Sequence, residues 1–129
     1  MTIDEATYAQ LGGTPYGRNI ISGNRANGIS LTRFSSASTI ADNYVGTDMT
    51  GTQPLPNAAD GIGIQNCSNN TIGGTLLDDA NLIAFNGRDG IRIDLGTNNA
   101  VRGNAIYGHD AGLGIELTNG GNHNRSSQS

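Results

Sequence analysis

The sequence has few aromatic and few charged residues for its length of 129 residues. It holds no tryptophan, and aromatic residues make up 5% and charged residues 14% of the chain. A large globular core depends on bulky apolar side chains, and a disordered chain depends on high charge, so neither class fits this composition. The composition favours a narrow, repetitive fold that needs only a thin core.

The chain also has only one cysteine, Cys67, so no disulfide can form within it. A thiol nucleophile needs a base beside it, and the two histidines, His109 and His123, lie far from Cys67 in the sequence. We therefore expect Cys67 to be a small buried residue without a catalytic role. The sequence contains neither a glycine-rich calcium repeat nor a phosphate-binding loop, and we predict no metal and no cofactor.

Basic residues are few and scattered along the sequence. The chain has seven basic and eleven acidic residues, for a net charge of -4. Nucleic-acid binding requires clustered basic side chains, so we predict no nucleic-acid partner. No apolar run approaches the roughly 20 residues of a membrane span, which predicts no membrane insertion. The start, residues 1–5, has neither the basic nor the apolar region of an export signal.

Glycine and asparagine, by contrast, are abundant, with 20 and 16 residues. Both tolerate left-handed backbone conformations, so they predict many tight turns. Sequence blocks also recur: residues 11–14 return as residues 72–75, and residues 19–24 return as residues 81–86, at offsets of 61 and 62. A repeat at a fixed period is typical of a chain wound into stacked coils.

A glycine followed by an alternating apolar tripeptide recurs four times. The four segments are Gly28–Leu31, Gly61–Ile64, Gly90–Ile93 and Gly114–Leu117. Alternation with β-branched residues predicts short strands with one buried face. Successive leading glycines are 33, 29 and 24 residues apart, and each interval contains about three short apolar segments. This spacing predicts triangular coils whose strands pair in parallel with those of the next coil. Asparagines at repeated turn positions, Asn24 with Asn86 and Asn43 with Asn104, are expected to form hydrogen-bonded ladders.

Two features favour other structures. Asn-Gly and Asp-Gly before the strands are typical of β-hairpins and of an antiparallel sandwich, although hairpins would not explain so long a repeat. Thr2 and Glu5 have the spacing of a capping box, which favours a helix over residues 2–11. The alignment of Leu11 with the strand residue Ile72 opposes that helix.

The predicted organisation is a single domain over residues 1–118 with a loop insertion at residues 47–58. That insertion holds two prolines and lacks alternation, and residues 76–80 form a smaller one. Residues 119–129 have nothing apolar to dock and are predicted to be a flexible tail. A short stack leaves unpaired strand edges at both ends, so we expect a homo-oligomer formed through the open coil ends.

Three segments, residues 19–24, 43–52 and 69–75, resemble the bacterial right-handed parallel β-helix repeat proteins, and the resemblance covers residues 10–124. It implies an all-β chain folded as a short right-handed parallel β-helix, or solenoid, of about four coils. Members of this family are mostly secreted or surface-attached, which suggests an extracellular or cell-surface location. Because they include lyases, hydrolases, epimerases and adhesins, the resemblance does not fix an activity.

The outward face of the predicted strands carries the candidate binding residues Arg92, Asp94 and Glu116. Glycosidase chemistry needs two carboxylates at ~5 Å or ~6.5–9.5 Å, and Asp94 and Glu116 lie on neighbouring coils. However, the first two coils add only uncharged residues to this face, and Arg92 with Glu116 would serve equally as an exposed ion pair. We predict no catalytic residue. The prediction is a non-enzymatic module, structural or binding carbohydrate or protein, with a polysaccharide as a candidate ligand. The alternative is a polysaccharide lyase, hydrolase or epimerase acting on this face.

Overall fold

A computed structural model describes residues 1–14 and 17–118, and the regular secondary structure of these residues is β except for one short 3₁₀ helix. The first sheet contains, in spatial order, β1 (Thr2–Asp4), β4 (Ile29–Thr32), β7 (Ile62–Gln65), β10 (Ile91–Asp94) and β13 (Ile115–Thr118). The second contains β2 (Gln10–Leu11), β5 (Thr39–Ile40), β8 (Thr71–Gly73) and β11 (Ala100–Arg102). The third contains β3 (Ile20–Ile21), β6 (Tyr44–Val45), β9 (Leu82–Ala84) and β12 (Ala105–Tyr107).

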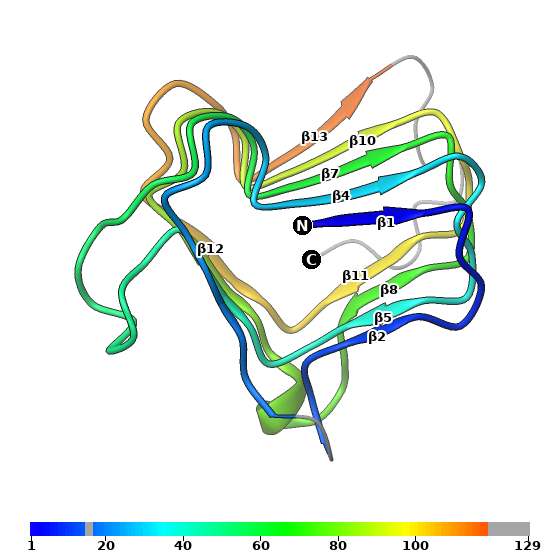
Figure 1. Ribbon diagram of the computed structural model, residues 1–129, viewed down its shortest axis with the longest axis horizontal. Helices are drawn as coiled ribbons and strands as arrows, with labels where there is room; N and C mark the ends of the chain where they lie inside the picture. The colour runs from blue at the N-terminus through cyan, green and yellow to red at the C-terminus, as the bar shows by residue number, and fades with distance from the viewer. Residues whose placement is uncertain (15–16, 119–129) are drawn as a thin grey trace.

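All pairings between these strands are parallel, which confirms an all-β chain with parallel sheets. The chain visits the first, second and third sheets in the same order each time, and one such passage is called a circuit below (Figure 1). Leu11 pairs with Ile40 and Ile40 with Ile72, so the 61-residue offset corresponds to two circuits. The hairpin alternative is wrong: among the described residues the antiparallel pairing is an isolated bridge between Thr47 and Pro54.

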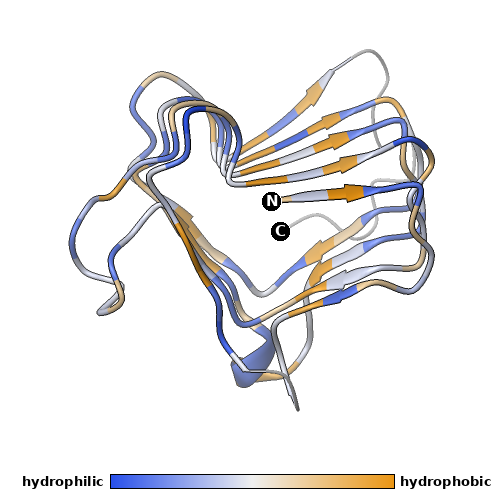
Figure 2. Cartoon of the chain, in the orientation of Figure 1, coloured by the Kyte–Doolittle hydropathy of each residue, from blue (hydrophilic) through white to orange (hydrophobic). Residues whose placement is uncertain are grey.

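The core is a set of columns of aliphatic side chains that run from circuit to circuit. Alternation sends every second side chain of a strand inward, and parallel register places those side chains directly above one another. The columns are Ile29–Ile62–Ile91–Ile115, Ile3–Leu31–Ile64–Ile93–Leu117, Leu11–Ile40–Ile72–Val101 and Ile21–Val45–Ile83–Ile106. Figure 2 shows the resulting apolar bands at matching places in successive strands of the first sheet. The middle members are fully buried, whereas Ile21, Ile106, Ile115 and Leu117 at the ends are only partly buried.

The first ten residues differ from the helical alternative. Thr2–Asp4 forms β1, which pairs with β4 and adds an edge strand to the first sheet. Its single inward residue, Ile3, is buried against Leu31 of the next circuit. Burial of Ile3 outweighs the local capping signal of Thr2 and Glu5, because a short isolated helix gains little in water. Leu11 is extended, as its alignment with Ile72 predicted.

Two insertions leave the stack, one at residues 47–54 and one at residues 76–80. The bridge between Thr47 and Pro54 closes a loop in which Asp48 Oδ1 accepts hydrogen bonds from Thr50 Oγ1 and three backbone N–H groups. These bonds, led by the Thr50 hydroxyl, lower the pKa of Asp48. Asn57 is completely buried and belongs to the stack. The smaller insertion contains a 3₁₀ helix, η1 (Leu77–Asp79).

Asparagine ladders line the corners of the stack, as predicted, and they include further rungs that the sequence did not reveal: Asn19, Asn57, Asn70, Asn81 and Asn99. In each ladder the side-chain N–H of one asparagine donates to the side-chain oxygen of the next. The ladders are Asn19–Asn43–Asn81–Asn104, with distances of 3.0, 3.1 and 2.9 Å, Asn24–Asn57–Asn86, with 2.9 and 2.9 Å, and Asn70–Asn99, with 3.1 Å. Since these side chains also bond to backbone carbonyls, they satisfy polar groups that the corners would otherwise bury unpaired.

His109 continues the ladder of Asn57 and Asn86. The backbone N–H of Asn57 donates to Asn86 Oδ1 at 3.3 Å, and the backbone N–H of Asn86 donates to His109 Nδ1 at 3.2 Å. His109 is therefore a half-buried rung of this ladder. Burial is the main cause that lowers the pKa of His109. Protonation of Nδ1 would also remove the acceptor that Asn86 uses.

This rung predicts a pH-dependent stability. A histidine whose folded-state pKa is lowered contributes its full stability above its ordinary pKa of about 6.5 and loses it as the pH falls below that value. We expect the free energy of unfolding, from urea titrations at pH 8 and pH 5, to fall more in the native protein than in His109→Asn, which restores the asparagine pattern. His123 is present in both proteins and does not affect the difference. Equal pH dependence would contradict this role.

The two ends of the stack differ from its middle in having strands with one open edge, β1 at one end and β13 at the other. The association through these ends that the sequence suggested stays a prediction. The expected tail, residues 119–129, lies outside the described residues. Within the described part of the chain, no helix has the length and apolar character needed to cross a membrane.

Candidate functional site

The outward face of the first sheet brings side chains from three circuits into register. Ser30 pairs with Gly63, Gly63 with Arg92, and Arg92 with Glu116, so these residues form one outward row across β4, β7, β10 and β13. Parallel strands lie about 4.8 Å apart, so neighbouring members of the row can contact the same small molecule. Gly63 has no side chain, which leaves a gap between Ser30 and Arg92.

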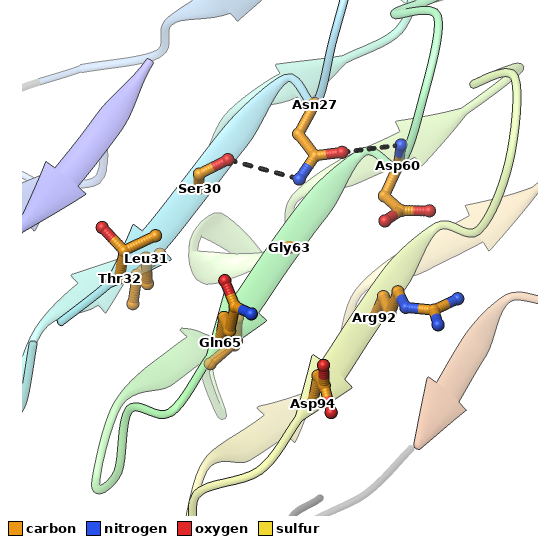
Figure 3. A pocket seen from close by; sticks show the side chains of 10 residues that line it. Asn27, Ser30, Leu31, Thr32, Asp60, Gly63, Gln65, Arg92 and Asp94 are labelled. Carbon is orange, nitrogen blue, oxygen red and sulfur yellow. Dashed lines mark hydrogen bonds between the residues drawn. The ribbon is translucent and has the colours of Figure 1, made fainter. Parts of the chain in front are cut away.

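A hollow of about 210 Å³ occupies this gap. Its lining combines hydroxyl, amide, carboxylate and guanidinium groups. The lining residues are Asn27, Ser30, Leu31, Thr32, Asp60, Gly63, Ile64, Gln65, Arg92 and Asp94. Figure 3 shows these side chains over β4, β7 and β10, with Asn27 and Asp60 at one end and Thr32, Gln65 and Asp94 at the other.

One end of the hollow is fixed by the turn residues that precede the strands. Asn27 Oδ1 accepts from the backbone N–H of Asp60 at 3.0 Å, and Asp60 Oδ1 accepts from that of Asp89 at 3.0 Å. Asp89 Oδ1 in turn accepts from the backbone N–H of Leu113 at 2.8 Å. Leu113 stands before Gly114, at the place where the other three strands have Asn or Asp, so it ends this ladder with its backbone N–H and offers no side-chain acceptor. The ladder holds the end of the hollow rigid.

Arg92 is held by Asp89, three residues earlier, with 3.3 Å between Nη1 and Oδ2. This geometry corrects the expected ion pair of Arg92 with Glu116: the two residues are in register on adjacent strands, but the guanidinium binds Asp89 instead. The reason is burial, since the Asp89 carboxylate is almost enclosed and its charge needs a partner. Arg92 is consequently a positioned group whose direction the protein fixes.

The structure places two of the three predicted site residues, Arg92 and Asp94, in the hollow. Glu116 lies one strand further along the same face, on β13, and does not line it. Sequence reasoning missed the part that Asn27 and Asp60 play, although it had identified both as turn residues before a glycine. The signal that could have indicated the hollow is Gly63, an outward strand position without a side chain.

Cys67 behaves as a core residue. It is 1% exposed, and its thiol donates to the carbonyl oxygen of Gln65 at 3.2 Å. Burial raises the pKa of the thiol, which opposes formation of a nucleophilic thiolate. Among residues 1–14 and 17–118, no three His, Cys, Asp or Glu side chains gather in a way that could hold a metal ion.

Comparisons with known proteins found no relative of this chain. No protein-family model, no curated protein and no solved structure matches this chain. The functional argument therefore depends on the hollow and its surroundings.

Proposed function

We propose that the chain is a short right-handed parallel β-helix of about four coils that serves as a non-enzymatic, carbohydrate-binding module of a surface-type repeat protein. The circuits through three parallel sheets support the fold, because a chain that winds continuously in one direction produces this strand order. The hollow between Ser30 and Arg92 carries the functional part of the proposal.

The chemistry of the hollow suits a sugar. A sugar ring presents hydroxyl groups that both donate and accept hydrogen bonds, and the hollow offers both kinds of partner. Gln65 supplies an amide and Asp94 a carboxylate. The Asn27 amide, which already binds Ser30 and the backbone N–H of Asp60, keeps one further N–H. The Thr32 hydroxyl, which donates to Asp4, can still accept. Sites for small ligands use a few such placed polar groups on a preformed surface, and here the strand register and the corner ladder preform it.

The carboxylates support binding rather than cleavage. Glycoside hydrolysis uses two carboxylates that flank the scissile bond. Of the two in the hollow, Asp60 is nearly buried and its Oδ1 is used by the backbone N–H of Asp89. That leaves Asp94 as the outward carboxylate of the hollow, with Glu116 beyond its edge. The enzyme alternative would need Glu116 to act from outside the hollow.

Filling the hollow should abolish binding. Gly63→Thr places a β-branched side chain, favoured in strands, where its Cβ would meet only the end of the Asn27 side chain. We expect folding to be retained and the affinity for polysaccharides that the native protein binds on a glycan array to fall at least about tenfold, measured by calorimetry. Asp94→Asn should weaken binding less, because an amide keeps one acceptor.

Thr39→Val, on the outward face of the second sheet, is the control and should bind normally. Native affinity in Gly63→Thr would contradict the assignment of the hollow. New reducing ends or unsaturated uronates released from the polysaccharide, and lost in Glu116→Gln, would instead establish the enzyme alternative.

A further inference from the structure

The corner that follows the first sheet is one residue longer in the second circuit than in its neighbours. Ile3, Leu31 and Ile64 are in register before the corner, and Thr7, Ser36 and Ser68 are in register after it. Residues 4–6 and 65–67 join these positions in the first and third circuits, whereas residues 32–35 join them in the second. The additional residue brings Phe34 to the surface, where it is 74% exposed.

The backbone at this corner is unfavourable for the side chains that it carries. Phe34 has a φ of 63° and Leu95, in the fourth circuit, a φ of 62°. This left-handed region is costly for bulky residues and tolerated by asparagine, as at Asn66, with a φ of 54°, between them. Leu95 is 42% exposed, so neither apolar side chain is placed here by the core. The left-handed corner recurs in every circuit, at Glu5 and Arg33 as well, so the fold requires this backbone. Neither the backbone nor the core, however, accounts for an exposed aromatic side chain at Phe34.

Phe34 and Leu95 stand on either side of an open groove of about 470 Å³. Its lining also contains Arg33, Asn66 and two residues that also line the hollow, Thr32 and Gln65, so the groove adjoins the hollow. Figure 3 shows Thr32 and Gln65 at the end of the hollow nearest this corner.

We propose that this groove is a second subsite for an oligosaccharide whose first ring occupies the hollow. The inference rests on the proposed function and specifies its ligand as an oligosaccharide of two or more rings rather than a monosaccharide. The electron-rich face of Phe34 receives the C–H face of the second ring, and the amides of Gln65 and Asn66 bind hydroxyl groups on its edge. Adjacency to the polar hollow favours a saccharide over a purely apolar partner.

The decisive variant is Phe34→Asn. Asparagine fits the left-handed backbone, so this protein should unfold at the same temperature as the native one or higher. Its affinity for xylose or galacturonate oligomers of two to four rings should nevertheless fall about tenfold, while its affinity for the corresponding single sugar stays unchanged. Phe34→Tyr keeps the aromatic platform and should bind both classes normally.

Tyr8→Asn is the matched control, since Tyr8 is also an exposed aromatic residue in the left-handed region, with a φ of 61° and 80% exposure, but lies outside the groove. It should not change either affinity. Native oligomer affinity in Phe34→Asn, or equal losses for the single sugar and the oligomers, would overturn the second subsite and leave the hollow in place. If the native protein binds none of these saccharides, both proposals fail.

Discussion

Gly46→Ala is expected to destabilise the protein by about 4 kcal/mol. Gly46 has a φ of 99°, and a Cβ there would collide with the carbonyl oxygen of Ala84 in the next circuit and with the Asn86 side chain. Ala84 and Asn86 are buried in the strand and the ladder of the third circuit, so they cannot move aside without breaking the stack. Urea unfolding followed by circular dichroism measures the loss.

Gly23→Ala separates the two causes. Gly23 also has a left-handed backbone, with a φ of 70°, but a Cβ there would meet nothing within 4 Å. The conformational cost alone, about 1–2 kcal/mol, should therefore remain. Equal losses at Gly46 and Gly23 would show that contact between circuits is looser than the structure indicates.

Asn43→Ala is expected to cost about 3–4 kcal/mol, because it breaks a ladder at a completely buried rung. Asn43 Nδ2 donates to the carbonyl oxygens of Leu11 and Ala41 and to Asn81 Oδ1, at 2.9, 3.0 and 3.1 Å. Asn43 Oδ1 accepts from the side chain of Asn19 at 3.0 Å. Alanine would remove the side-chain donor from all three oxygens, although Leu11 O keeps the backbone N–H of Ala41 and Asn81 Oδ1 keeps the backbone N–H of residue 43. The Ala41 carbonyl oxygen loses this donor, and a cavity replaces the amide.

The exposed first rung of the same ladder provides the comparison. Asn19→Ala removes one donor to Asn43, but water can replace it, so a loss below about 1 kcal/mol is expected. Asn43→Asp tests the polarity of the ladder, because a carboxylate keeps the acceptor and lacks both donors. It should destabilise at least as much as alanine at pH 7. A small loss at Asn43 would mean that the ladder is dispensable.

Much of this fold could be predicted from the sequence, because the alternation of apolar residues within strands and the repetition of sequence blocks both indicate a stack of parallel strands. Ile62 and Ile64 were expected to point inward, and both are buried in columns that continue through the neighbouring circuits. Strand β1 was missed because it has one inward residue, Ile3, and no leading glycine, so only its pairing with β4 defines it. Asn57 was assigned to the loop because the insertion conceals its spacing of 29 residues from Asn86.

The candidate site could be predicted only in part. The outward direction of Arg92 and Asp94 follows from alternation along β10, which the sequence shows directly. The hollow exists because Gly63 has no side chain. The direction of Arg92 follows from its ion pair with Asp89, and the sequence spacing alone does not show that Arg92 binds Asp89 rather than Glu116. The groove beside Phe34 depends on a difference of one residue between circuits, which appears only when their registers are compared.

The asparagine ladders also give the stack an electrostatic polarity along its axis, from circuit to circuit. In the ladder that starts at Asn19, each bond between asparagine side chains runs from the amide N–H of one circuit to the amide oxygen of the next, so these bonds share one direction along the stack. The remaining N–H donors of Asn43, Asn81 and Asn104 bind backbone carbonyls of the preceding circuit. The face at Asn19 presents amide oxygen and carries partial negative charge, while the face at Asn104 presents amide N–H and carries partial positive charge. A stack built in this way distinguishes its two ends to any approaching chain or ion, even where the circuits at those ends have similar shapes.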